Sequence, residues 1–196
     1  METKRKILVI YTGGTIGMIM DKDSSTLKPL EFEHMAEFIP EFSDCDYDLD
    51  YVSFDPTLDS SNMDPDGWIK LASIIENNYE SFDGFVILHG SDTMAYSASA
   101  LSFMLENLNK PVVFTGSQLP LGISRTDGKE NFVTAVEIAA QHKEKTPMVP
   151  EVCIYFENQL YRGNRTFKYN AENFDAFRSE NYPVLADVGV YIKFNS

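Results

Sequence analysis

Short apolar runs recur along the sequence, and polar turns follow several of them. The run from Ile7 to Ile10 contains four consecutive apolar residues and ends just before Tyr11 and a glycine-rich turn. A continuous apolar run of this length is typical of a parallel strand that is buried on both faces. The same interpretation predicts further strands at residues 51–54, 85–88, 111–114, 152–156 and 188–194.

Between these predicted strands, apolar residues recur at helical spacing. Asp64 and Pro65 suit the cap and the first position of one helix, and Asp127 and Glu130 resemble a capping pair at the start of another. Three apolar stripes mark helix faces. They consist of Trp68, Leu71, Ala72, Ile75 and Tyr79; of Met94, Ala98, Leu101, Leu105 and Leu108; and of Phe132, Val136 and Ala139.

The strands alternate with helices that are long enough to cross from one strand to the next. This alternation predicts an α/β fold with a doubly wound, mainly parallel sheet and helices on both faces, of the Rossmann or flavodoxin-like kind. Such sheets bind ligands beyond the carboxyl ends of their strands, near the switch point in strand order. The polar turns at Thr12, His89 and Thr115 follow strands at that edge.

Composition narrows the possible function classes. The 196 residues are 43% hydrophobic and carry a formal net charge of -14, which fits a globular domain and argues against a nucleic-acid partner. Cys45 and Cys153 have neither a disulfide-like nor a metal-like spacing. The run at 7–10 is too short for a signal peptide, and no stretch is long enough to span a membrane. We therefore expect a cytoplasmic protein without a metal, a cofactor or a membrane partner.

The turn from Thr12 to Gly17 presents a hydroxyl at the sheet edge. The adjacent glycines Gly13 and Gly14 allow a sharp turn and a close approach of a ligand, and Thr15 follows them. The spacing matches neither the dinucleotide nor the P-loop pattern. From spacing alone, a structural turn and a functional one are equally open.

A second turn, Gly90 to Thr93, carries Ser91 and Asp92. Asp92 suits a helix cap, and Ser91 suits a hydroxyl that satisfies the turn backbone. A catalytic role for such a hydroxyl would require a base, which a lysine can be, but the spacing does not select one.

Three histidines are further candidate bases. His34 and His142 lie in polar, helix-like stretches and are predicted at the surface. His89 suits packing or hydrogen bonding at a strand end as well as catalysis. The sequence shows neither a Ser-His-Asp order nor a glycine-flanked serine elbow.

Taken in order, these motifs resemble the bacterial asparaginase/glutaminase family, and in detail its cytoplasmic, type I branch. The resemblance runs along nearly the whole chain. It rests on Thr12-Gly13-Gly14-Thr15-Ile16-Gly17, Asp59-Ser60-Ser61-Asn62-Met63, His89-Gly90-Ser91-Asp92-Thr93-Met94 with the helix after it, Thr115-Gly116-Ser117-Gln118 and Tyr161-Arg162-Gly163-Asn164-Arg165.

The resemblance implies an L-asparaginase that converts L-asparagine to L-aspartate and ammonia. Thr15 would be the nucleophile, and Ser91, Asp92 and Lys168 would form a second centre in which Lys168 accepts a proton. Ser60 would hold the substrate's α-carboxylate and Asp92 its α-amino group. The implied substrate-binding residues are Gly14, Asp59, Ser60, Ser61, Gly90 and Ser117.

The sequence departs from the family pattern in three places. Ser91 stands where the family usually has Thr, so the hydroxyl is kept on a less restricted side chain. The family often places a lid tyrosine beside the nucleophile, but Met18 to Pro29 contains none, and Leu27 takes its place. Family chains also continue into a smaller C-terminal domain that helps to build a homodimer or homotetramer.

These departures shape the expected domain organisation. We expect residues 1–182 to be the catalytic N-terminal domain and residues 183–196 to be a terminal strand and the start of an interdomain linker. Without the C-terminal domain, weaker association and poor activity are expected.

Other functions stay open at this stage. One is the glutamine amidohydrolase subunit of a tRNA-dependent amidotransferase, which has the same fold. Another is a catalytically silent domain that binds asparagine. A nucleotide-binding module is disfavoured, because the phosphate fingerprint is missing.

Overall fold

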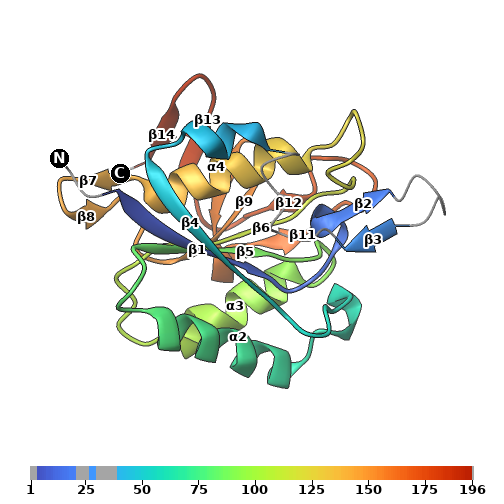
Figure 1. Ribbon diagram of the computed structural model, residues 1–196, viewed down its shortest axis with the longest axis horizontal. Helices are drawn as coiled ribbons and strands as arrows, with labels where there is room; N and C mark the ends of the chain where they lie inside the picture. Colours follow the sequence, from blue (N-terminus) through green and yellow to red (C-terminus); the bar gives the residue numbers. More distant parts are fainter. Residues whose placement is uncertain (1–3, 21–26, 30–38, 196) are drawn as a thin grey trace.

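An eight-stranded sheet runs through the middle of the protein (Figure 1). The computed structural model describes residues 4–20, 27–29 and 39–195. In spatial order, the strands are β14 (Ile192–Phe194), β13 (Ala186–Val188), β10 (Gln159–Arg162), β9 (Val152–Phe156), β6 (Val112–Thr115), β5 (Gly84–Leu88), β1 (Arg5–Tyr11) and β4 (Tyr47–Ser53).

The strands from β9 to β4 are parallel, whereas β10, β13 and β14 are antiparallel to their neighbours. Counted along the chain, the parallel strands lie in the order 2-1-3-4-5, which is the flavodoxin-like arrangement. The predicted doubly wound, mainly parallel sheet is thus confirmed. Its switch point lies between β1 and β5, because the chain passes from β1 outward to β4 and then returns to place β5 on the other side of β1.

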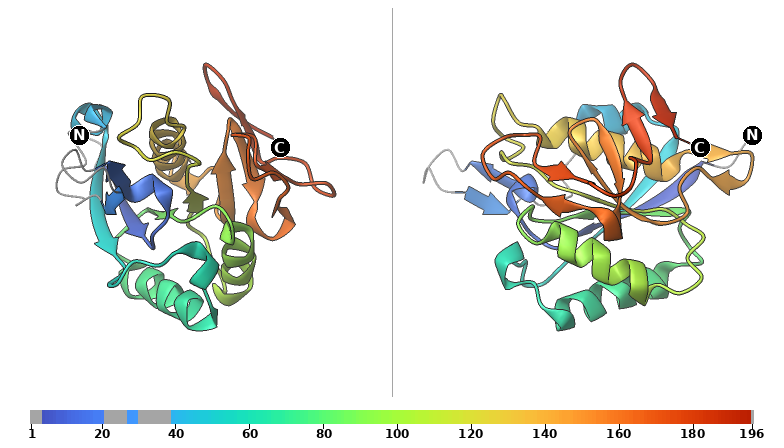
Figure 2. Two further views of the ribbon diagram at one scale, coloured as in Figure 1. Left: turned by 90° about the vertical axis from the view of Figure 1, so that its right-hand side faces the viewer. Right: turned by 180° about the vertical axis from the view of Figure 1, so that it is seen from behind.

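Helices cover both faces of the sheet, as predicted. Helices α2 (Pro65–Asn78) and α3 (Met94–Met104) lie together on one face, and α4 (Gly128–Ala140) lies on the other (Figures 1 and 2). Successive side chains of β1 point to opposite faces of the sheet. Ile7 and Val9 belong to the hydrophobic cluster on the α4 side, whereas Leu8 and Ile10 belong to the cluster on the side of α2 and α3.

Short elements complete the chain. Within the described ranges, the 3-10 helices are η1 (Thr15–Gly17), η3 (Pro40–Asp44), η4 (Ser60–Asn62) and η5 (Gly163–Arg165). Among the residues that the structure describes, small two-stranded sheets pair β2 (Met18–Met20) with β3 (Leu27–Pro29), β7 (His142–Lys143) with β8 (Thr146–Pro147), and β11 (Phe167–Lys168) with β12 (Phe177–Arg178).

Two predicted elements end differently in the structure. The second apolar stripe predicted a helix as far as Leu108, but α3 ends at Met104. Leu105 leaves the helical region and Asn107 has a positive φ of 54°, because the chain turns back here toward β6. The strand predicted at 188–194 is a hairpin of β13 and β14, with Gly189 in its turn (Figure 2).

The predicted capping pair is also corrected. Asp127 occupies the cap position of α4, but its side chain makes no cap hydrogen bond. Its carboxylate accepts from the backbone N–H groups of Gln118 and Leu119 instead, and Glu130 accepts from the hydroxyl of Tyr155. In contrast, Asp64 caps α2 as predicted, by accepting from the N–H of Gly67.

Two of the predictions concern residues or side chains that the structure does not describe. His34 lies outside the described residues, and the position of the Leu27 side chain is not among those described. Within the described ranges, no helix is both long and apolar enough to cross a membrane.

One histidine lies inside the core. His89 follows β5 directly and is fully buried. Its Nδ1 lies 2.7 Å from the carbonyl oxygen of Gly90, and its Nε2 lies 2.9 Å from Oγ of Ser97. Burial lowers the pKa of His89 from 6.5 to about 4, because a charged imidazole would lose its hydration. The side chain is therefore neutral and hydrogen-bonded in the folded protein near pH 7.

We predict that Ile87→Ala destabilises the protein by about 2–5 kcal/mol, because Ile87 is fully buried in the central strand β5 and its loss leaves a cavity. The matched control is Ile69→Ala on α2, where the side chain is 55% exposed and the expected change is within about 0.5 kcal/mol. Urea unfolding followed by circular dichroism measures both. Equal effects of the two variants would contradict this packing.

We also predict that His89 makes the fold acid-sensitive. Below pH 6.5 the unfolded chain binds a proton at this residue, whereas the folded chain binds one only near pH 4. The free energy of unfolding should therefore fall by about 1 kcal/mol per pH unit across this window, and be unaffected above it. Urea unfolding of His89→Asn between pH 4.5 and 7 should show a shallower loss. An equally steep loss in the variant would refute the prediction.

Candidate active site

Two turns meet at the carboxyl edge of the sheet, on either side of the switch point. One follows β1 and leads to Thr15, and the other follows β5 and leads to Ser91. At their contact, a Cβ atom on Gly14 would lie 2.5 Å from the amide nitrogen of Gly90, and Gly14 has a φ of 92°. Only glycine tolerates both this conformation and this approach. The two predicted hydroxyl residues therefore belong to turns in direct backbone contact.

A third turn packs against these two. The N–H of Leu58 donates to the carbonyl of Thr12 at 2.8 Å, which fixes the turn before η4 beside the Thr15 turn. Ser60 is buried, and a Cβ atom on Gly90 would lie 2.5 Å from its Oγ. The hydroxyl of Thr93 donates to the carbonyl of Ser60 at 2.6 Å. The structure thus brings the predicted residues Gly14, Ser60 and Gly90 together.

Thr15 opens the short helix η1 and is partly exposed. Among the residues that the structure describes, none forms a hydrogen bond with its hydroxyl group. The hydroxyl is therefore available to a ligand at the sheet edge.

Ser91, Asp92 and Lys168 form one contact group, although Lys168 is 76 residues from Asp92 in sequence. Lys168 on β11 donates from Nζ to Oγ of Ser91 at 2.9 Å and to Oδ1 of Asp92 at 2.7 Å. The Lys168 side chain is only 13% exposed, whereas that of Asp92 is 67% exposed. The structure thus assembles the three residues that the resemblance assigned to a second centre.

Gln118 joins this group and was missed as a site residue. Its Oε1 lies 3.4 Å from Oγ of Ser91, and its Nε2 donates to the carbonyl of Asn173 at 3.0 Å. The sequence analysis identified the motif Thr115-Gly116-Ser117-Gln118, but the sequence does not indicate which of its side chains points toward Ser91. Its neighbour Ser117, which the sequence analysis predicted at the site, is buried, and its hydroxyl donates to the carbonyl of Leu119 at 2.6 Å.

Asp59 and Ser61 are bonded to each other. The carboxylate of Asp59 accepts from the N–H of Ser61 at 2.9 Å and from its hydroxyl at 2.7 Å, and so caps η4. These bonds lower the pKa of Asp59, because they stabilise the charged form. Both residues are exposed and lie beside the buried Ser60.

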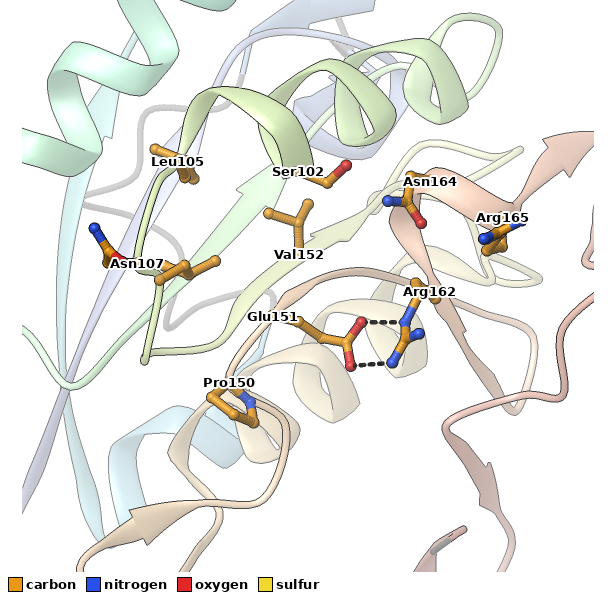
Figure 3. Close-up of a pocket in the computed structure, with 10 residues that line it drawn as sticks. Ser102, Leu105, Asn107, Pro150, Glu151, Val152, Arg162, Asn164 and Arg165 are labelled. Atoms are coloured by element: carbon orange, nitrogen blue, oxygen red, sulfur yellow. Dashed lines mark hydrogen bonds and ion pairs between the residues drawn. The ribbon is translucent and has the colours of Figure 1, made fainter.

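A separate cleft of about 450 Å³ lies where β9 begins, away from the carboxyl edge of the sheet (Figure 3). It is lined by the end of α3 and by residues around the start of β9. Glu151 there forms two hydrogen bonds with the guanidinium of Arg162, at 2.6 and 3.0 Å. This cleft holds none of the predicted site residues.

The site at the carboxyl edge suits hydrolysis through a hydroxyl nucleophile. It offers the Thr15 hydroxyl, a second hydroxyl on Ser91 and a lysine that contacts both Ser91 and a carboxylate. Within the described ranges, no group of three or more His, Cys, Asp or Glu residues could hold a metal ion.

Comparison with known proteins identifies the family. Residues 6–196 match the family model described as asparaginase, N-terminal. The chain is 46% identical to L-asparaginase 1 of Escherichia coli over 97% of its own length and 55% of the relative's. It is also 32% identical to an L-asparaginase of Thermococcus kodakarensis, over 93% of its own length and 53% of the relative's.

A solved structure shows the same fold. L-asparaginase I from Vibrio cholerae superposes with a TM-score of 0.87 at 44% identity, over 98% of this chain and 56% of that one. The chain therefore spans about half the length of these asparaginases. Because the family model covers nearly every residue, the chain belongs to the asparaginase family and corresponds to its N-terminal domain.

Proposed function

We propose that this protein hydrolyses the side-chain amide of L-asparagine to L-aspartate and ammonia, through an acyl-enzyme on Thr15. The observation that carries the proposal is the contact of Lys168 with both Ser91 and Asp92, next to the turn that presents Thr15. A hydroxyl is a weak nucleophile until a base takes its proton, and a lysine amine can serve as that base. The names of the relatives support asparagine as the substrate.

The reaction takes two steps. In the first, Oγ1 of Thr15 forms a bond to the side-chain carbonyl carbon of asparagine. The hydroxyl proton passes to Lys168, directly or through Ser91 and a water, and then to the leaving nitrogen as the C–N bond breaks. Ammonia leaves and an ester to Thr15 remains. In the second step, water adds to this ester, aspartate is released and the Thr15 hydroxyl is restored.

The remaining site residues would hold the substrate. We assign the α-carboxylate to Ser60 and the α-amino group to Asp92, whose carboxylate is more exposed than Lys168 beside it. Gly14 and Gly90 are assigned to the same pocket, because their lack of side chains lets the turns that carry Thr15, Ser91 and Ser60 pack against one another. Asp59, Ser61 and Ser117 are assigned to the surrounding pocket, where their hydrogen bonds hold the turns in shape.

The cytoplasmic location and the homo-oligomeric state stay predictions. A solved structure with the same fold carries the name probable cytoplasmic L-asparaginase, from Campylobacter jejuni; its TM-score is 0.83 at 28% identity, over 98% of this chain and 57% of that one. This name supports the proposed location.

We predict that Thr15→Ala lowers ammonia release from asparagine by about a thousandfold or more, because the attacking oxygen is removed. Thr15→Ser is the control, because it keeps a hydroxyl at the same place and should retain part of the activity. A coupled ammonia assay measures all three proteins. Equal rates for Thr15→Ala and the unaltered protein would refute the role of Thr15. A shift in melting temperature with aspartate should persist in Thr15→Ala, since binding does not need this oxygen.

We predict that Lys168→Met lowers kcat by about a hundredfold or more while the protein stays folded, because the proton acceptor is lost. The matched control is Lys129→Met. Lys129 also forms an ion pair at 2.7 Å, with Glu41, but its side chain is 43% exposed and belongs to α4. Kinetics and circular dichroism are recorded for both variants. Retained turnover in Lys168→Met would remove this residue from the mechanism.

A further inference from the structure

The carbonyl groups just before Thr15 and Ser91 are each held by a buried aromatic side chain. The hydroxyl of Tyr11 donates to the carbonyl of Gly14 at 3.1 Å. Nδ1 of His89 lies 2.7 Å from the carbonyl oxygen of Gly90. Tyr11 is the last residue of β1, and His89 follows the last residue of the paired strand β5. At the end of each of these two neighbouring strands, an aromatic side chain thus forms a hydrogen bond with a carbonyl group of the turn that follows.

The hydrogen bonds of His89 define its tautomer. A carbonyl oxygen can only accept, so Nδ1 carries the proton and Nε2 is the acceptor. The hydroxyl of Ser97 therefore donates to Nε2, and its oxygen accepts from Nε1–H of Trp68 at 3.0 Å. The chain of bonds runs in one direction, from Trp68 through Ser97 and His89 to the Gly90 carbonyl.

A held carbonyl also orients the next N–H group. In a planar trans peptide, the C=O bond and the following N–H bond point in opposite directions. The bonds from Tyr11 and His89 therefore fix the directions of the N–H groups of Thr15 and Ser91. Across the described residues, neither of these N–H groups has a hydrogen-bond acceptor. Both donors remain available to a ligand.

We propose that Tyr11 and His89 are positioning residues that aim the N–H groups of Thr15 and Ser91 at the oxyanion formed during amide hydrolysis. The proposal rests on the proposed function and deepens it. In acyl transfer, preorganised N–H donors contribute strongly, because they need no reorientation as negative charge develops. The structure supplies the rigidity that such donors require.

Packing makes both holding groups rigid. Tyr11 is 1% exposed and His89 fully buried. A Cβ atom on Gly17 would lie 2.2 Å from the ring of Tyr11, so the ring fills the space under η1 that this glycine leaves. Burial raises the pKa of Tyr11 to about 12 and lowers that of His89 to about 4, so both keep the same hydrogen-bonding form across the neutral range.

The two positions are not equivalent. The Gly14 carbonyl also accepts from the N–H of Gly17 at 3.3 Å, so one bond survives the loss of the Tyr11 hydroxyl. Among the described residues, His89 is the one donor to the Gly90 carbonyl. Removal of the His89 bond should therefore have the larger effect on catalysis.

The kinetic test separates positioning from general packing. His89→Leu should lower kcat for asparagine by about three- to tenfold and leave KM within about twofold, as expected for the loss of one neutral hydrogen bond to the site. His89→Asn places an amide N–H near the position of Nδ1 and should restore kcat to within about twofold of the unaltered protein. Equal kcat values for the Leu and Asn variants would overturn the proposal, as would a change confined to KM.

A second kinetic test uses the other turn, and it also decides the question if His89→Leu does not fold. Tyr11→Phe should lower kcat by about two- to threefold. The control is Tyr79→Phe, which removes a tyrosine hydroxyl that donates to Oδ1 of Asn109 at 2.6 Å, just before β6 and so at the edge of the sheet opposite the two turns. The control should leave kcat unchanged. An equal loss in both variants, or no loss in Tyr11→Phe, would overturn the positioning role of Tyr11.

A measurement independent of turnover keeps this inference separate from the proposed function. Nitrogen-15 NMR of the unaltered protein should show His89 as the neutral Nδ1–H tautomer at pH 7. Addition of aspartate should shift the amide resonances of Thr15 and Ser91. The Nε2–H tautomer would overturn the proposal even if asparagine is hydrolysed. The expected tautomer and shifts, with no release of ammonia from asparagine, would refute the proposed reaction and leave the positioning of the two N–H groups in place.

Discussion

The backbone contact between Gly14 and Gly90 is the constraint on which the site depends. Two parallel strands at the switch point end at the same level, and their turns meet with no side chain between them. A side chain at Gly14 would push the two turns apart, since its Cβ atom would lie 2.5 Å from the amide nitrogen of Gly90. A side chain at Gly90 would instead press on Ser60 in the third turn. The turns that carry Thr15 and Ser91 meet because Gly14 has no side chain.

The central strands of the sheet hold these two turns in place. The strands β1 and β5 are buried on both faces by the two apolar clusters, so their ends cannot shift independently. The polar groups at these ends are satisfied within the protein: the Thr12 hydroxyl donates to the Leu88 carbonyl, and the His89 N–H donates to the Thr115 carbonyl. A rigid core and satisfied backbone groups thus carry the partly exposed residues Thr15 and Ser91.

Much of the fold could be predicted from the sequence, since continuous apolar runs, such as the one at residues 7–10, are typical of buried parallel strands. The apolar pattern did not predict features that depend on contacts between distant parts of the chain. Leu105 and Leu108 fit a helical stripe, but the return of the chain to β6 ends α3 at Met104. Lys168 could be assigned only through the family resemblance, because spacing along the chain gives no distance across 76 residues. Gln118 was missed, because the direction of a loop side chain depends on contacts such as that with Asn173.

The hydrogen bond from Trp68 to Ser97 has an optical consequence. Trp68 is the single tryptophan of the chain, so all indole emission of this protein comes from one ring on α2. That ring stands at the far end of the chain of bonds that reaches the Gly90 carbonyl. Indole emission depends on the polarity and hydrogen bonding around Nε1. The molecule therefore contains its own fluorophore, connected through two side chains to the turn that carries Ser91.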